Sequence, residues 1–306
     1  MIRSLIARGI AKAASRRSLI LLLYLVGLGV AALLAVPVFR AVDTLFGSSG
    51  FSAELARRFD IVLWMDMLEK GGTALAGAMR QFFWAIPLFI VWKVASQVGL
   101  VYALKDDGQA SFWEGVSRYT LRGLLLALIY LLLGGFAIAI LWIILVLIIK
   151  GQGEPGQFWT AIVIGPILSI VILALFDLMH DYARMRLVLR RDGIWRSFLS
   201  GSFFPIRRLS ALFLYKVWFL VGGVLWLLPF WLDGVFAKTT IAGMLGAFLV
   251  QQIVILTRHG ATVAWIGSEV FYFEANAEAL IEPADDAVSE GPGPDSVEPT
   301  GNGPKV

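Results

Sequence analysis

The distribution of apolar residues along the chain predicts helices that cross a membrane. A helix needs about 20 mostly apolar residues to span the hydrocarbon core, because each residue advances it by about 1.5 Å. Six stretches meet this condition, and they lie at residues 19–39, 82–104, 123–149, 158–179, 211–232 and 241–257. The sequence therefore predicts an all-α fold, a six-helix transmembrane bundle that occupies residues 1–282.

Two polar segments outside these spans have patterns of their own. Residues 52–70 place apolar side chains near one helical face and end at Gly71 and Gly72, which predicts an amphipathic helix lying on the outer surface. Residues 283–306 are rich in proline, glycine and acidic residues and cannot form a packed core. We expect this acidic tail to be disordered.

Composition strengthens the membrane prediction and narrows the chemistry. Hydrophobic residues make up 58% of the 306 residues and charged residues 16%, whereas soluble domains average roughly 45–50% and about 25%. The chain has no cysteine, which excludes disulfides, thiolate metal sites and a cysteine nucleophile. No P-loop, G-x-S-x-G, H-E-x-x-H or Rossmann motif is present. We therefore predict no enzymatic activity and no cofactor.

The basic residues predict the orientation of the spans. The connections on the side of the N-terminus, with Arg258, contain 16 Lys and Arg residues, and the connections on the other side contain 7. Because basic loops stay on the cytoplasmic side, both termini are expected to face the cytoplasm of a bacterial inner membrane. The net charge is +12 up to Arg258, whereas the remaining tail is acidic. Anionic lipid head groups are the expected partners of this basic surface, together with other membrane proteins, and nucleic acid is not.

A threefold internal repeat is a second prediction. The strings RRSLILLLY, RGLLLALIY and RRLSALFLY occupy residues 16–24, 122–130 and 207–215, and a small residue precedes each by seven positions, at Gly9, Gly115 and Ser200. Each unit would comprise a basic amphipathic helix on the inner leaflet, a turn into the membrane and a hairpin of two spans. Chance similarity in a chain rich in Leu and Arg is the alternative. The expected head-group contacts are Arg16, Arg17, Arg118, Arg122, Arg207 and Arg208.

These features resemble a known group of proteins. The string RFDIVLWMDML after the first span, and the repeated basic helix leading into a span, are similar to a broad set of bacterial polytopic inner-membrane proteins whose function is not established. The resemblance covers most of the membrane part. It implies the architecture and carries over no catalytic residue.

One group of polar residues within the spans is a candidate solute site. Lys93 is the only formal charge near the middle of a span, and Gln97 follows one turn later. An intramembrane charge is costly and is expected to face the bundle interior or water. The candidate midplane site comprises Lys93, Gln97, Ser169, Gln251 and Gln252. The alternative is that Lys93 only joins helices by hydrogen bonds.

A second group lies where the fourth span ends. In DLMHDYAR, the residues Asp177, His180, Asp181 and Arg184 share one helical face, so three of them have metal-ligand chemistry. The arginine on the same face favours a solvated helix end instead, and no metal is predicted. His180 and His259 both follow inward spans, which leaves a bis-histidine haem as a remote alternative.

Three functional hypotheses follow from these patterns. The leading one is a non-enzymatic inner-membrane protein that organises protein partners or lipids at the cytoplasmic face, because its charges gather at the inner surface. The second is a transporter or channel for a small solute, with its site around Lys93. The third is a membrane redox protein with a bis-histidine haem.

Overall fold

The structure is a computed structural model, and over the residues that it describes all regular secondary structure is helical. These residues are 2–46, 72–105, 110–152, 155–233 and 240–277, with the single positions 65, 69 and 235. The predicted outer helix at 52–70, apart from two positions, and the predicted tail at 283–306 lie outside them. The helices are α1 (Ile2–Ser15), α2 (Arg17–Phe46), α5 (Gly72–Leu104), α6 (Phe112–Gln152), α7 (Pro155–Leu189), α8 (Ile194–Arg207), α9 (Leu209–Asp233) and α10 (Ile241–Ala277).

Five of these helices are long and apolar enough to cross a membrane. The apolar stretches are Arg17–Pro37 in α2, Phe83–Leu104 in α5, Phe112–Ile149 in α6, Ile162–Leu189 in α7 and Leu209–Leu232 in α9. The structure thus agrees with an all-α membrane protein. The predicted sixth span, 241–257, is helical throughout as part of α10 but is not among the five. Gln251 and Gln252 interrupt its apolar sequence, and Arg258 follows it directly.

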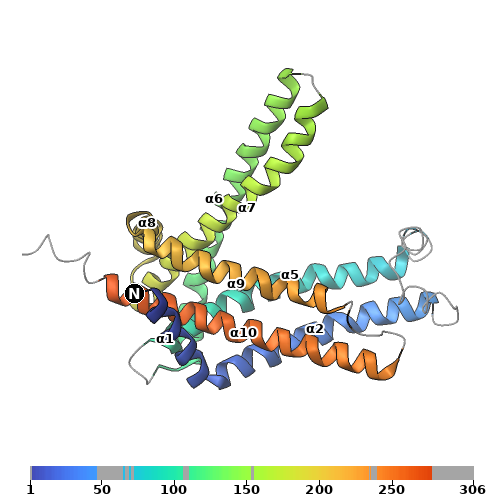
Figure 1. Cartoon of the computed structure of the whole chain (residues 1–306), viewed down its shortest axis with the longest axis horizontal. Coiled ribbons are helices and arrows are strands. Elements are labelled where there is room, and N and C mark those ends of the chain that lie inside the picture. Colours follow the sequence, from blue (N-terminus) through green and yellow to red (C-terminus); the bar gives the residue numbers. More distant parts are fainter. Residues whose placement is uncertain are drawn as a thin grey trace, which may run out of the picture.

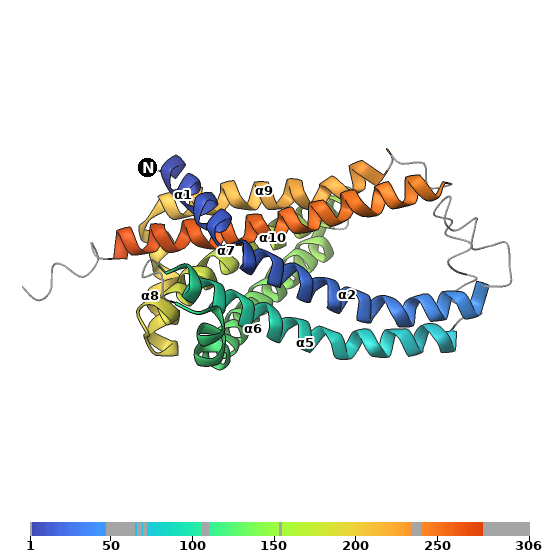
Figure 2. The ribbon, with the colours of Figure 1, turned by 90° about the horizontal axis from the view of Figure 1, so that it is seen from below.

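The long helices form three pairs. Helix α2 lies beside α5, α6 beside α7 and α9 beside α10, and the α6–α7 pair leaves the other two at a wide angle (Figures 1 and 2). Helices α5, α7 and α10 contact one another near the end where α1 and α8 pack. We call this packed end, made of α1, α8 and the adjoining ends of the long helices, the base.

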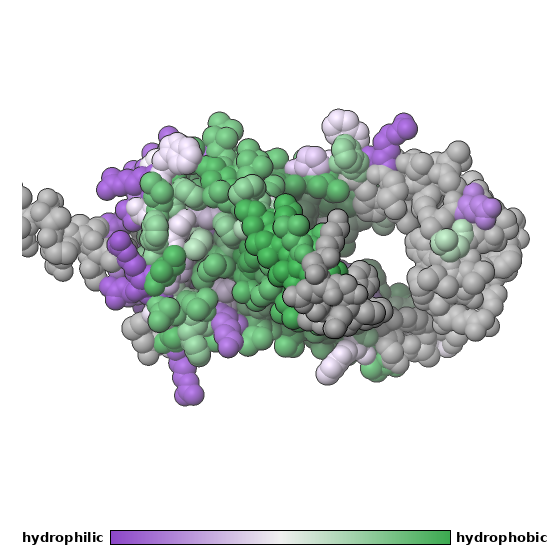
Figure 3. Space-filling model, turned by 90° about the horizontal axis from the view of Figure 1, so that it is seen from above, coloured by the Kyte–Doolittle hydropathy of each residue, from purple (hydrophilic) through white to green (hydrophobic). Residues whose placement is uncertain are grey.

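The described hydrophobic core is concentrated in the base. Its buried members include residues 98 and 100–104 of α5, several residues of α7 between 178 and 188, and several of α10 between 263 and 273. Only 6% of the apolar stretches of α2 and α6 is buried. Figure 3 correspondingly shows hydrophobic surface over the long helices and hydrophilic residues gathered toward the base. Beyond the base, the helix pairs expose the apolar surface that a lipid environment accepts.

Close glycine contacts attach three amphipathic segments to the base. A Cβ atom on Gly9 of α1 would lie 2.5 Å from the Ala264 carbonyl oxygen of α10, and one on Gly115 of α6 would lie 2.5 Å from Tyr102 Cβ of α5. A Cβ on Gly201 of α8 would collide with the backbone of Ala183 in α7. Glycine permits these backbone approaches because it has no side chain. Each segment therefore packs against the end of a long helix.

The structure corrects two details of the repeat prediction. In the third segment the close contact is made by Gly201, one residue after Ser200, the residue that aligns with Gly9. The helix break that follows this segment is likewise one residue late, at Arg208, whereas the first unit breaks at Arg16, which aligns with Arg207. The predicted turn before the second unit's outward span is absent, since α6 is continuous from Phe112.

The glycine pairs within the spans, which the sequence also offers as places for close helix packing, do not make close contacts. A Cβ on Gly135, Gly222 or Gly223 would meet nothing within 4 Å, and one on Gly134 would make only ordinary contact with Phe176. The helices approach most closely in the base instead, because that is where three long helices and the amphipathic segments converge.

Candidate functional site

Charged side chains are buried where the long helices converge in the base. Helix α7 provides Asp177, His180, Asp181 and Arg184, whose spacing of three and four residues puts them on one face. Arg184 is 2% exposed and Asp181 is 5% exposed. Buried charges require partners, because removing them from water is costly.

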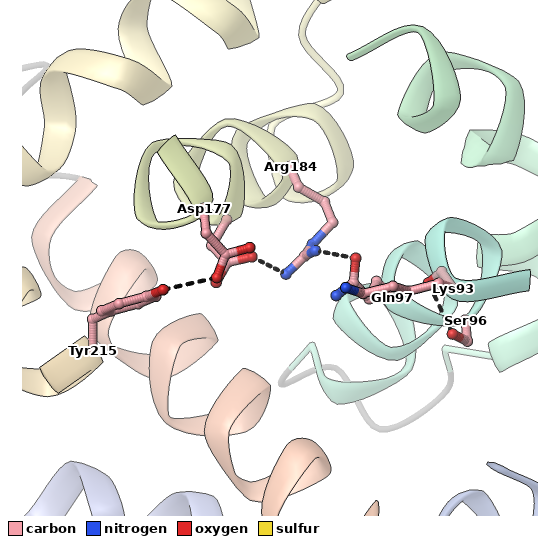
Figure 4. A network of polar contacts seen from close by, with 7 residues as sticks. Lys93, Ser96, Gln97, Asp177, Arg184 and Tyr215 are labelled. Atoms are coloured by element: carbon pink, nitrogen blue, oxygen red, sulfur yellow. Dashed lines mark hydrogen bonds and ion pairs between the residues drawn. The ribbon is translucent and has the colours of Figure 1, made fainter. Parts of the chain in front are cut away.

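Arg184 is the centre of the network. One guanidinium nitrogen donates to the Asp181 carboxylate and another to the Gln97 side-chain oxygen of α5, both at 2.6 Å (Figure 4). The third nitrogen, Nε, has no hydrogen-bond partner. Arg184 therefore joins α7 to α5 through a charge-assisted hydrogen bond and neutralises Asp181.

The neighbouring helix α9 is joined through a second carboxylate. The Tyr215 hydroxyl donates to Asp177 at 2.8 Å, as Figure 4 also shows. Tyr215 is the last residue of the third repeated string, so the tyrosine that closes this string makes a specific contact with another helix. We call Gln97, Asp177, Asp181, Arg184, Tyr215 and Glu269 together the polar junction.

Helix α10 contributes the most deeply buried acid of the junction. Glu269 is 0% exposed, and among the described residues neither carboxyl oxygen has a hydrogen-bond partner of standard geometry, although the Trp265 indole lies close by. Burial and the charge of Asp181 raise the pKa of Glu269 well above its usual range, and the indole of Trp265 opposes the rise only in part. Glu269 lies beyond the predicted sixth span, and its burial favours the neutral, protonated carboxyl group.

The raised pKa of Glu269 predicts a pH-dependent stability. Between the ordinary glutamate pKa, about 4.3, and the raised value, the folded state binds more protons than the unfolded state. The free energy of unfolding must therefore fall as pH rises through that window. We expect the melting temperature in detergent to fall as the pH rises above the ordinary glutamate pKa, and Glu269→Gln to reduce that fall. Asp43→Asn, at an exposed acid of α2, is the control, and an unchanged slope in Glu269→Gln would count against the buried proton.

The five candidate midplane residues do not come together in one site. Gln97 belongs to the polar junction, and Lys93, one turn away and exposed, interacts electrostatically with Asp181. Ser169 instead donates to the Gly165 carbonyl and accepts from the Trp142 indole, within the α6–α7 pair. Gln252 accepts a hydrogen bond from Tyr24 at 3.0 Å, and Gln251 is exposed. Of the five, the contacts associate only Lys93 and Gln97.

The structure also describes the residues considered above as possible metal or haem ligands. Ligand atoms of Asp177, His180 and Asp181 lie within 4.8 Å of one another, but Arg184 and Tyr215 already engage the two carboxylates. The ring of His180 packs against Tyr130 with centroids 5.3 Å apart. The His259 ring lies beside Gly27 of α2. The two histidine rings thus lie against different helices, α6 and α2.

The arginines predicted to contact lipid head groups lie in the base and at the adjoining helix ends. Arg17, Arg118, Arg122 and Arg207 are exposed, and Arg16 and Arg208 are half-buried. The guanidinium of Arg118 also lies 5.8 Å from the Tyr119 ring centroid. Four of the six thus present their charge at the surface of amphipathic segments or where these segments pass into long helices.

Sequence reasoning missed one residue of the polar junction, Glu269, and one contact, between Tyr215 and Asp177. Glu269 has a recognisable signal, because it is an isolated acid in the string WIGSEVFYF, whose apolar members Ile266, Val270 and Phe273 follow a buried helical face. The contact between Tyr215 and Asp177 joins residues 38 positions apart. No local pattern reveals a partner at that separation.

Comparisons of the chain with protein-family models, curated proteins and solved structures find no match. Over the described part of the chain, the fold is that of an all-α protein with five helices long and apolar enough to span a membrane. The resemblance to bacterial polytopic inner-membrane proteins remains a prediction.

Proposed function

We propose that the chain is a non-enzymatic, multi-pass inner-membrane platform that organises anionic lipids and membrane protein partners at the cytoplasmic face. The observation that carries this proposal is the separation between a densely packed base and helix pairs that expose their apolar surfaces. A rigid base holds several lipid-facing hairpins in fixed relation, while each hairpin offers its sides to lipid or to another membrane helix.

The proposed architecture is three repeated units and six crossings, with α10 as the sixth. Each unit begins with a basic amphipathic segment fixed by a close glycine contact, at Gly9, Gly115 or Gly201. Its outward helix then carries a tyrosine whose hydroxyl bonds another helix, since Tyr24 bonds Gln252, Tyr130 bonds Ser202 and Tyr215 bonds Asp177. The distribution of basic residues supports a cytoplasmic base with both termini inside a bacterial cell.

Anionic lipid is the expected partner for an electrostatic reason. Exposed Arg118, Arg122 and Arg207 lie beside exposed apolar residues such as Leu121 and Ile206. This combination suits the boundary between head groups and acyl chains, where each basic residue contributes about 1 kcal/mol of attraction to an anionic leaflet.

The test is lipid clustering in vesicles that contain a minor fraction of self-quenching fluorescent phosphatidylglycerol. Wild-type protein is expected to increase quenching, and the triple variant Arg118→Gln, Arg122→Gln, Arg207→Gln is expected to lose most of that increase. The control removes three basic residues predicted to lie outside, with Arg40→Gln, Arg80→Gln and Lys150→Gln, and should quench like wild type. Equal quenching by both triple variants would contradict lipid organisation at the base.

The transporter hypothesis is examined with the same vesicles. Lys93 lies in the apolar stretch of α5 and interacts electrostatically with the polar junction, which is the observation that favours solute binding. The platform proposal expects no solute flux from wild-type protein. A wild-type flux that Lys93→Met abolishes would replace the platform by a transporter.

A further inference from the structure

A small cavity between α9 and α10 combines a cation with indole side chains. Its volume is about 130 Å³, and its walls include Trp218 and Gly222 from α9 and Arg258, Thr262 and Trp265 from α10. A volume of this size accommodates several water molecules or one small anion. The cavity adjoins the polar junction through Trp265 but contains none of the junction's residues.

Arg258 supplies an unneutralised positive charge at this cavity. It has no ion pair with an acid among the described residues, and its side chain is exposed. It follows the beginning of α10 by 17 residues, which corresponds to about 26 Å along a helix. The hydrocarbon core is about 30 Å thick, so a crossing by α10 would bring Arg258 near the inner head-group boundary.

Trp218 adds a hydrogen-bond donor that the protein leaves unused. The residue is 5% exposed, and its indole N–H is buried without a hydrogen-bond partner among the residues that the structure describes. Buried donors normally have partners, and Trp218 and Arg258 both belong to the wall of this cavity, so an acceptor bound there would lie near an indole donor and a cation. Guanidinium groups bind phosphate through two parallel hydrogen bonds, which makes phosphate the best-matched acceptor.

We propose that this cavity binds a phosphate group, with Arg258 providing the charge and Trp218 a hydrogen bond. The phosphate can come from an anionic membrane lipid or from a soluble phosphate compound. Exposed Leu220 and Val224 of α9 and Leu256 of α10 flank the cavity in sequence and offer apolar surface for acyl chains. This favours the lipid as the source. The site goes beyond the proposed platform function and does not depend on it, because a protein that clusters no lipid can still hold one here.

Two substitutions in the cavity wall and one matched control test the site. Arg258→Gln removes the charge. Gly222→Leu fills the cavity, and a Cβ at Gly222 meets nothing within 4 Å, so the change should leave the backbone in place. Gly223→Leu is the control, because Gly223 is the next residue of α9, has the same free space and does not line the cavity. Circular dichroism establishes that each variant is helical.

The measurement is lipid binding by native mass spectrometry of the full chain in detergent, with phosphatidylglycerol and phosphatidylcholine as probes. We expect wild type and Gly223→Leu to prefer phosphatidylglycerol about tenfold, and Arg258→Gln to lose that preference, as expected for a charge-assisted phosphate contact. Gly222→Leu should bind phosphatidylglycerol about tenfold more weakly than Gly223→Leu. Wild-type affinity in Arg258→Gln, or equal affinities in the two glycine variants, would overturn the site.

Inorganic phosphate and glycerol phosphate at millimolar concentration distinguish the two sources. If neither displaces bound phosphatidylglycerol, the acyl chains contribute to binding and the ligand is a lipid. If either displaces it from wild type and binds Arg258→Gln less well, the cavity is a site for a soluble phosphate compound. The vesicle-clustering result does not enter this comparison, so failure of the platform and failure of the cavity site are separate outcomes.

Discussion

Replacing Arg184 by methionine is expected to reduce the free energy of unfolding by about 3–5 kcal/mol, the usual cost of removing one member of a buried ion pair. The substitution leaves Asp181 buried without its 2.6 Å partner and removes the link to Gln97 on α5. Glu269 also loses a nearby positive charge. The measurement is the unfolding midpoint in detergent micelles, followed by the loss of helical signal.

Two further variants identify the cause of that loss. Arg190→Met removes an exposed arginine just beyond α7 and should change stability little. The double variant Asp181→Asn, Arg184→Met removes both charges and should recover part of the stability lost in the single variant. If Arg184→Met were as stable as Arg190→Met, Arg184 would not be compensating buried acids.

Introducing a methyl group at Gly201 should be the next most damaging change, with a cost of about 1–3 kcal/mol from overpacking. A Cβ there collides with the Ala183 backbone, which cannot move without separating α8 from α7. Gly201→Ala is expected to lower the unfolding midpoint in detergent and to increase protease cleavage within α8.

The matched control for that change is Gly193→Ala. Gly193 precedes α8, has an extended backbone and no atom within 4 Å of an added Cβ, so alanine fits without strain. Because Gly193 is the N-cap of α8, where alanine is less favourable than glycine, its unfolding midpoint should fall slightly, and much less than that of Gly201→Ala. Equal midpoints for Gly201→Ala and Gly193→Ala would contradict the close α7–α8 contact on which the base depends.

The sequence predicts the membrane helices well because their signal is local. Runs such as 123–149 contain enough apolar residues to identify a span without knowledge of any contact. The positions of Gly9 and Gly115 were likewise visible in the repeat, although the reason for glycine, a close backbone approach, required the structure. The continuity of α6 was not predicted, because the same basic and apolar residues are compatible with a turn or a straight helix.

The polar junction was only partly predictable. The α7 face follows from residue spacing, and the presence of Gln97 in a polar cluster follows from its depth beside Lys93. Its partner Arg184 is 87 residues away, so the pairing depends on how α5 packs against α7. Gln252 and Ser169 have similar estimated depths but bond to different helices, which depth alone cannot reveal.

The orientation of the base is tested most directly by labelling introduced cysteines with a membrane-impermeant maleimide. The chain contains no cysteine of its own, so each variant carries a single reactive thiol. Arg196 on α8 has a side chain that is 74% exposed, and Val235, in the connection between α9 and α10, is 71% exposed. We predict that Val235→Cys reacts in right-side-out spheroplasts and that Arg196→Cys reacts only in inverted vesicles. Reaction of Arg196→Cys from the outside, with Val235→Cys protected there, would contradict a cytoplasmic base.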